Sequence, residues 1–236
     1  SRRRRLFMKT KIHKKGIVIA VIVIGLTIAM SIVDGVISPP YYLKSIIKII
    51  LFLGGPLLYL KIWHKEPGVI RKLFKPDKKD LLLSVSLGAG VFAVIMVAYF
   101  FCRNFIDFAG IQSALTGGIG VTADNFIFVA LYISLANSLL EEFFFRGFAF
   151  ILLKKETNRL FAYLFSAAMF SLYHVGMTSG WFNIGVFLLM MFGLFAGGCI
   201  FSFLNEKCDN IYPSWLVHLC ANLAINTIGC ILFGIL

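Results

Sequence analysis

Seven long apolar stretches run through this chain and restrict the folds open to it. We expect membrane spans at about 17–37, 43–62, 81–102, 126–150, 160–177, 183–204 and 212–234. Each is close to the roughly 20 residues that a helix needs to cross a bilayer. The chain is 59% hydrophobic and 14% charged, which is more apolar surface than a soluble domain can bury. It lacks the short alternating segments of a membrane β-barrel. The sequence therefore predicts an all-α, polytopic transmembrane helical bundle, with residues 1–236 forming a single integral membrane domain.

Basic residues alternate in density between the connecting segments. The tail over 1–16 is strongly basic, and so are the segments 61–80 and 146–159 that follow the expected second and fourth spans. The intervening segments 103–125 and 176–182 hold one arginine and no basic residue, respectively. Since Lys and Arg are retained on the cytoplasmic side, we expect a multi-pass protein of the cell membrane with a cytoplasmic N-terminus and an outer C-terminus.

The basic tail and two lysines need separate interpretations. Lys44 and Lys48 lie within the second expected span, and we expect their long side chains to snorkel toward the headgroups. The tail is expected to meet anionic lipid, and no nucleic-acid partner is expected. The first methionine is Met8, so residues 1–7 are either the remnant of an added sequence or a processed start. The first apolar stretch is long for a signal peptide and is interpreted as a span.

The connections and the cysteines suggest no further module. Residues 61–80 are expected to form a surface connection, and residues 104–115 a short interfacial helix. The five cysteines have no regular spacing, which favours small packing residues over disulfides or a metal site. They are Cys102, Cys199, Cys208, Cys220 and Cys230.

Two adjacent glutamates and an arginine interrupt the fourth expected span. Ionisable groups at membrane depth are costly and usually functional. On a helix, Glu142 and Arg146 are four residues apart and can form an ion pair, whereas Glu141 is rotated by about 100°. We therefore expect Glu142 and Arg146 to support the structure. Glu141, with weak charge compensation, is expected to face a cavity as a general base. A purely structural role, in which both glutamates bridge helices, is the alternative.

Two later spans also contain isolated polar residues. His174 lies in the fifth, and His218 and Asn222 lie one turn apart in the seventh, where a His and a carboxamide could stabilise an oxyanion. A rise of about 1.5 Å per residue puts the glutamates roughly 12–18 Å from the cytoplasmic end of their span. By the same measure, His174 lies about 20 Å from the cytoplasmic end of its span. His218 and Asn222 lie roughly 9–15 Å from the cytoplasmic end of theirs. The comparable depths predict one site in the inner half of the membrane.

Three motifs together resemble the CAAX-protease and bacteriocin-processing (CPBP, or Abi) family. E-E-x-x-F-R-G matches residues 141–147, F-x-x-x-H matches Phe170 and His174, and H-x-x-x-N matches His218 and Asn222. The resemblance covers about residues 126–226, which would form the catalytic core in the later helices. Family members typically have about eight helices, against the seven spans expected here.

The resemblance implies an intramembrane endopeptidase with a water-accessible cavity open to the cytosol. Glu141 and His174 would activate the attacking water, and His218 and Asn222 would stabilise the tetrahedral oxyanion. Glu142 and Arg146 would support the site.

The sequence leaves the role of a metal open. It lacks H-E-x-x-H, the helical zinc signature, although two histidines and a glutamate could still make a three-ligand zinc site. Asparagine is a poor zinc ligand and a good oxyanion donor, so we expect no cofactor and a glutamate-type protease. A zinc metalloprotease is the alternative.

The sequence is compatible with three functional classes. We prefer a peptidase, followed by a scaffold and then a transporter. A non-catalytic scaffold or regulator would bind the transmembrane segment of a partner membrane protein. A transporter would also explain intramembrane glutamates, but repeated halves are not evident. The expected partners are the lipid bilayer and a peptide or membrane-protein substrate, with a secreted peptide precursor or a membrane-anchored leader preferred to a prenylated CAAX protein.

Overall fold

A computed structural model describes residues 14–63, 68–76, 78–178 and 180–236, which form helices and no strands. Seven of the described helices are long and apolar enough to cross a membrane, which confirms the predicted fold class. They are Lys14–Ile37, Tyr41–Trp63, Asp80–Phe101, Ala123–Glu156, Arg159–Thr178, Ile184–Cys208 and Tyr212–Leu232. The basic tail expected over 1–16 lies mostly outside the described residues.

Three of the spans are built from several consecutive segments. The first joins α1 (Lys14–Ile32) to the π-helical η2 (Val33–Ile37), and the second joins α2 (Tyr41–Ile49), η3 (Ile50–Gly54) and α3 (Gly55–Trp63). The fourth contains α7 (Ala123–Tyr132), η4 (Ile133–Asn137), α8 (Ser138–Glu141), η5 (Glu142–Leu152) and α9 (Leu153–Glu156). The other four are α5 (Lys78–Cys102), α10 (Arg159–Thr178), α11 (Ile184–Cys208) and α12 (Tyr212–Leu232).

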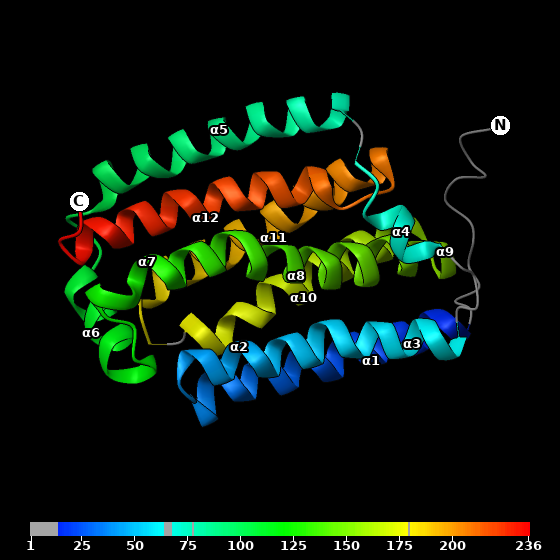
Figure 1. Ribbon diagram of the computed structural model, residues 1–236, viewed down its shortest axis with the longest axis horizontal. Helices are drawn as coiled ribbons and strands as arrows, with labels where there is room; N and C mark the ends of the chain where they lie inside the picture. Colours follow the sequence, from blue (N-terminus) through cyan, green and yellow to red (C-terminus); the bar gives the residue numbers. More distant parts are fainter. Residues whose placement is uncertain (1–13, 64–67, 77, 179) are drawn as a thin grey trace.

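The helices form a bundle with the fourth and fifth spans at its centre (Figure 1). Helices α1 to α3 lie along one edge, and α5 lies along the opposite edge, where it packs against α12. Helix α10 packs against α1, α11 and η5. This arrangement surrounds the glutamate-bearing segment of the fourth span with helices from both edges.

Two short helices lie in the connections. Helix α6 (Phe108–Ile119) replaces the helix expected over 104–115; the Asp107 side chain accepts from the Gly110 amide at 2.9 Å, and Gly120 ends the helix with a φ of 71°. Helix α4 (Val69–Leu73) falls in the connection expected over 61–80, of which residues 64–67 and 77 lie outside the described part. Leu73 is buried and its carbonyl accepts from the Ile211 amide at 3.1 Å, so this connection is anchored rather than loose.

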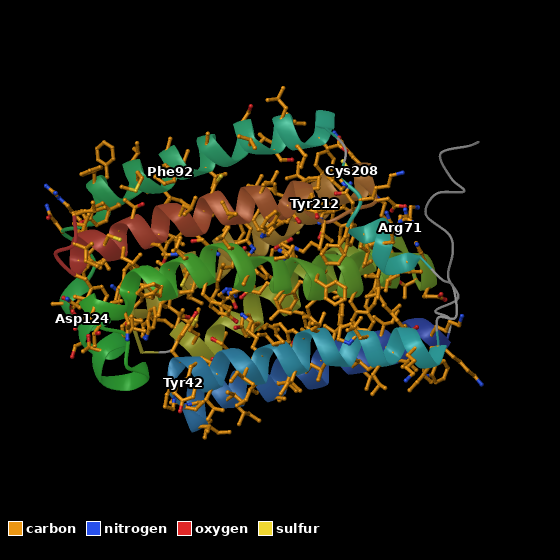
Figure 2. The ribbon with its side chains drawn as sticks, viewed as in Figure 1. Tyr42, Arg71, Phe92, Asp124, Cys208 and Tyr212 are labelled. Carbon is orange, nitrogen blue, oxygen red and sulfur yellow. The ribbon has the colours of Figure 1, made fainter. Side chains whose placement is uncertain are left out.

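The two ends of the bundle carry different side chains. Tyr42 and Asp124 lie near one end, whereas Arg71 lies near the other (Figure 2). A cavity of about 260 Å³ at the Arg71 end is lined by Lys72, Leu73, Lys155 and Asp209, among others. The hydrogen bond from Lys72 to Asp209, at 2.7 Å, lowers the pKa of that carboxyl. This cavity lies away from the glutamates and does not supply the site predicted from the motifs.

Close helix crossings depend on glycine at two positions near the centre. A Cβ atom at Gly176 in α10 would lie 2.6 Å from the Ser31 carbonyl oxygen of α1. One at Gly198 in α11 would lie 3.0 Å from Ala167 of α10 and 3.4 Å from an Arg146 nitrogen. Small residues let transmembrane backbones approach closely. These glycines therefore bring α1 and α11 against the two sides of α10.

The fourth span is not the regular α-helix that the sequence predicts. It widens into π-helix at Ile133–Asn137 and again at Glu142–Leu152. The Ser166 hydroxyl of α10 donates to the Phe145 carbonyl at 2.7 Å inside the second widened segment. Segments of π-helix are rare and are often found at functional sites. Here the first segment ends four residues before Glu141, and the second begins at Glu142.

Candidate active site

Arg146 lies fully buried between a carboxylate and two aromatic rings. Its Nη1 is 3.2 Å from Glu142 Oε1, and both side chains are entirely inaccessible to solvent. The guanidinium carbon is 4.0 Å from the centre of the Phe170 ring and 5.0 Å from that of Phe201. Cation–π contacts of this kind strengthen when the cation is desolvated. The expected Glu142–Arg146 ion pair is present, and Phe170, the first residue of its motif, contacts the cation.

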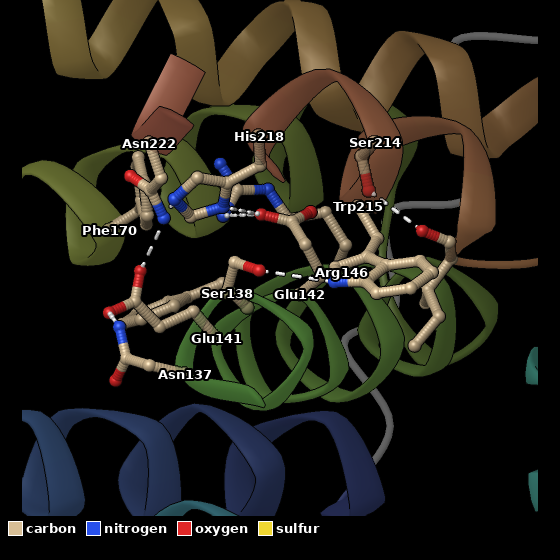
Figure 3. Close-up of polar contacts among 12 residues, drawn as sticks. Asn137, Ser138, Glu141, Glu142, Arg146, Phe170, Ser214, Trp215, His218 and Asn222 are labelled. Carbon is tan, nitrogen blue, oxygen red and sulfur yellow. Dashed lines mark hydrogen bonds and ion pairs between the residues drawn. The ribbon is translucent and has the colours of Figure 1, made fainter. Parts of the chain in front are cut away.

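His218 lies between the two glutamates (Figure 3). Its Nδ1 is 2.9 Å from Glu142 Oε1, and its Nε2 is 3.7 Å from Glu141 Oε2. A carboxylate can only accept a hydrogen bond, so Nδ1 carries the proton in this contact. Helix α12 therefore contributes one imidazole that connects Glu142, and through it Arg146, to Glu141.

Glu141 is paired with a lysine, which corrects two expectations from the sequence. Lys48 Nζ of α2 donates to Glu141 Oε1 at 2.5 Å and to Asn137 Oδ1 at 2.6 Å. The Lys48 and Glu141 side chains are only 6% and 4% exposed. Lys48 therefore does not snorkel to the headgroups, and Glu141 is not weakly compensated. Lys44 is also buried, with its Nζ 2.9 Å from Asp34 Oδ1.

His174 presents one ring nitrogen to its own helix. Its Nδ1 is 2.7 Å from the Phe170 carbonyl oxygen, which can only accept, so Nδ1 carries the proton and Nε2 keeps its lone pair. Glu141, Lys48 and His218 are all close enough to interact with it electrostatically. Among the described residues, no hydrogen bond joins His174 to Glu141 directly. The two are neighbours in one polar cluster, with His174 only half-buried.

Asn222 and Asn226 connect α12 to the fourth span. Asn222 Nδ2 donates to the Ile133 carbonyl at 3.2 Å, and Asn226 Nδ2 donates to the Ala130 carbonyl at 3.1 Å. Each amide nitrogen carries two hydrogens, so Asn222 keeps a second donor. His218 and Asn222 thus lie against the same span from one helix, as their spacing predicts. Asn226, to which the sequence gave no role, adds a hydrogen bond between the helices.

The structure adds residues to this cluster that the motifs do not include. Lys48, Asn137 and Phe201 contact the predicted residues, and Trp215 Nε1 donates to Ser138 Oγ at 3.1 Å. The position of Lys48 inside an apolar stretch was a detectable signal that this residue has a role. Its partner Glu141 is 93 residues away in sequence, so the contact itself depends on the fold.

The carboxylates of this cluster already have cationic partners, which bears on metal binding. Among the described residues, no group of three His, Cys, Asp or Glu side chains is arranged to hold a metal ion. Glu141 and Glu142 are each already paired with a cation, Lys48 and Arg146. A zinc ion bound to either carboxylate would add positive charge beside an existing buried one.

The structure brings all six predicted residues together in one cluster. Glu141, Glu142, Arg146 and His218 are linked by ion pairs and hydrogen bonds, and His174 and Asn222 join the cluster from α10 and α12. The polar contacts come from α2, the fourth span, α10 and α12. The site is thus assembled from elements spread along most of the chain.

Comparison with protein families gave a match to the model described as type II CAAX prenyl endopeptidase Rce1-like, over residues 123–224. No curated protein and no solved structure matched the chain. The matched segment contains all six predicted residues and all three motifs, and it agrees closely with the core expected over 126–226. The predicted resemblance to the CAAX-protease family is confirmed over residues 123–224, which are similar to the Rce1-like type II CAAX prenyl endopeptidases.

Proposed function

We propose that this protein is an intramembrane endopeptidase of the glutamate type that hydrolyses a peptide bond in a membrane-associated peptide or protein. The observation that carries the proposal is the cluster of buried Glu141 and His218 with the half-buried His174, within seven helices able to span a membrane. Buried carboxylates and imidazoles close together are the groups that general acid–base catalysis requires. The family match supports a protease.

Water activation falls to Glu141 and His174. Glu141 Oε1 is occupied by Lys48, whereas Oε2 accepts no hydrogen bond from a described residue. The free Nε2 of His174 and Glu141 Oε2 are the two lone-pair groups available to a water molecule. One of them takes a proton from water while the oxygen attacks the carbonyl carbon. The resulting tetrahedral intermediate collapses with cleavage of the C–N bond, and the proton is transferred to the leaving amine.

Oxyanion stabilisation falls to His218 and Asn222. His218 already directs its Nδ1 hydrogen at Glu142, so donation from Nε2 requires the imidazolium form. Asn222 supplies its second amide hydrogen, because the first is bound to Ile133. Donors fixed before the reaction stabilise developing charge most effectively.

The chemistry proposed here uses no cofactor. The charges around Glu141 and Glu142 are already met by Lys48 and Arg146, and no metal-binding group of three is found in the part of the chain that the structure describes. Zinc remains the alternative that the experiment below tests directly.

We also propose the orientation and the substrate class. The basic connections put the N-terminus in the cytoplasm and the C-terminus outside, in the cell membrane. A secreted peptide precursor or a membrane-anchored leader is the preferred substrate. A partner membrane protein bound without cleavage is the alternative function, and the following comparison separates the two.

The test compares purified wild type with Glu141→Gln and His174→Gln on a membrane-peptide library read by mass spectrometry, with and without a zinc chelator. Both substitutions should lower cleavage at least ~100-fold, because each removes a proton acceptor. Asp124→Asn is the matched control, since Asp124 is an exposed carboxylate on the same span and should be neutral.

Three outcomes would contradict parts of this proposal. Cleavage by Glu141→Gln at the wild-type rate would remove Glu141 from the mechanism. Loss of wild-type cleavage with chelator would establish the zinc alternative. A cellular phenotype that persists in Glu141→Gln would favour the scaffold.

A further inference from the structure

Lys48 contacts the predicted catalytic residues although it lies far from them in the sequence. It belongs to α2, outside the matched segment 123–224, yet its ammonium group bonds to both Glu141 and Asn137 of the fourth span. Asn137 Nδ2 also donates to Glu141 Oε1 at 3.0 Å, so the three side chains form a closed triangle.

Aromatic rings fix Lys48 in this position. Its Nζ lies 4.7 Å from the centre of the Tyr173 ring and 5.6 Å from that of Phe52. Tyr173 directly precedes His174 in α10, and Phe52 lies one turn beyond Lys48 in the second span. The Lys48 residue as a whole is 4% exposed. A long side chain held on several sides keeps little rotamer freedom, so its ammonium group has a defined location.

The contacts of Lys48 make the two oxygens of Glu141 unequal. Oε1 accepts from Lys48 at 2.5 Å and from Asn137 at 3.0 Å, whereas Oε2 faces His218 Nε2 at 3.7 Å, beyond hydrogen-bond distance. The lone pairs of Oε1 are therefore committed to the protein. Oε2 lies on the side of His218 and has no hydrogen-bond donor among the described residues.

We propose that Lys48 is a positioning residue for Glu141: it fixes the orientation of the carboxylate through Oε1 and leaves Oε2 as the oxygen that acts on water. This rests on the proposed peptidase function. Each glutamate then pairs with its own cation. Glu142 pairs with Arg146 of the same span, whereas Glu141 pairs with Lys48 of the second span. The first hundred residues thus contribute a functional side chain to the family core.

The chain offers a matched control for this proposal in Lys44. It lies one turn from Lys48 on α2, is 8% exposed, and pairs with Asp34 at 2.9 Å, but it does not contact the predicted catalytic residues. Replacing Lys44 by Met removes a second buried ion pair of the same helix. The comparison of Lys44→Met with Lys48→Met therefore separates the loss of a buried ion pair from the loss of Glu141 positioning.

The experiment measures kcat and KM for Lys48→Met, Lys48→Arg and Lys44→Met in detergent, per folded molecule. The probe is the peptide that wild type cleaves fastest in the library. Misplacing a catalytic group by about 1 Å costs roughly 100-fold, so Lys48→Met should lower kcat by that order with KM changed less than about threefold. Lys48→Arg should recover most of the rate because it restores the cation, and Lys44→Met should retain the wild-type kcat.

Defined results would overturn the assignment. Lys48→Met with the kcat of Lys44→Met, or folded Lys48→Arg as slow as Lys48→Met, would show that Lys48 has no specific role. If Lys48→Met does not fold, Lys48→Gln takes its place under the same criteria, since its shorter side chain lacks the ammonium group that pairs with Glu141. Wild type that cleaves nothing in the library overturns the peptidase proposal as well. Active wild type with an equally active Lys48 variant overturns only this inference.

Discussion

The guanidinium of Arg146 has no access to solvent, and its charge is met by Glu142 at 3.2 Å and by the faces of Phe170 and Phe201. A buried charge whose partner is removed costs far more than the pair contributes when intact. The same holds in reverse for Glu142. Loss of either residue therefore leaves the other as an unpaired buried charge. The His218 contact with Glu142 connects the pair to the site.

Arg146→Met should lower the free energy of unfolding by about 3–5 kcal/mol, because it leaves Glu142 buried without its cation. The measurement is thermal or denaturant unfolding of the purified protein in detergent. Arg159→Met is the control: Arg159 pairs with Glu206 at 2.8 Å with its side chain 56% exposed, and exposed pairs contribute about 1 kcal/mol or less. Equal losses in both variants would contradict the buried-pair interpretation.

At the scale of the helices, the site depends on how α10 lies between its neighbours. Helix α10 supplies His174 together with Phe170 and Tyr173, the rings that contact Arg146 and Lys48. It approaches α1 closely at Gly176, two residues beyond His174. A shift of this crossing would therefore move His174 relative to Glu141.

Gly176→Ala should destabilise the protein by about 1–3 kcal/mol, since the new methyl group would meet the Ser31 backbone at 2.6 Å. Cleavage should fall as well, because α10 must move away from α1. Gly25→Ala in α1 is the matched control: nothing lies within 4 Å of its Cβ position, and no loss of stability is expected. Wild-type stability and activity in Gly176→Ala would show that this crossing does not position His174.

The interruptions of the fourth span also belong to this scale. Apolar periodicity predicts that a helix is present but does not distinguish α from π geometry over a few residues. The widened segments at Ile133–Asn137 and Glu142–Leu152 occur where hydrogen bonds from α10 and α12 reach the backbone of the span. Their partners come from distant parts of the chain, so the sequence of the span alone could not reveal them.

At the scale of the whole molecule, seven spans would put the two termini on opposite sides of the membrane. Seven described helices are able to span, and the connections at the Arg71 end of the bundle are the basic ones. The Lys72–Asp209 and Lys154–Glu206 pairs lie in or next to these connections. The charge distribution therefore predicts that the Arg71 end of the bundle faces the cytoplasm.

A reporter enzyme that is active only outside the cytoplasm should be active when fused after Leu236 and inactive when fused within the connection at Lys75. The reason is the excess of Lys and Arg retained on the cytoplasmic side. Fusion within the connection at Gly180, expected on the outer side, is the positive control. Activity at Lys75 with none at Leu236 would mean that the protein is inserted the other way round.

The sequence by itself determined the class of fold, the approximate limits of the seven spans, the Glu142–Arg146 pair and the six candidate residues. These follow from hydropathy over some 20 residues and from spacing along one helix, which are local properties. The tertiary structure decided the partner of Glu141, the contact of Arg146 with Phe170 and Phe201, and the proton position on both histidines. Such contacts join residues on different helices, and their geometry exists only once those helices have packed together.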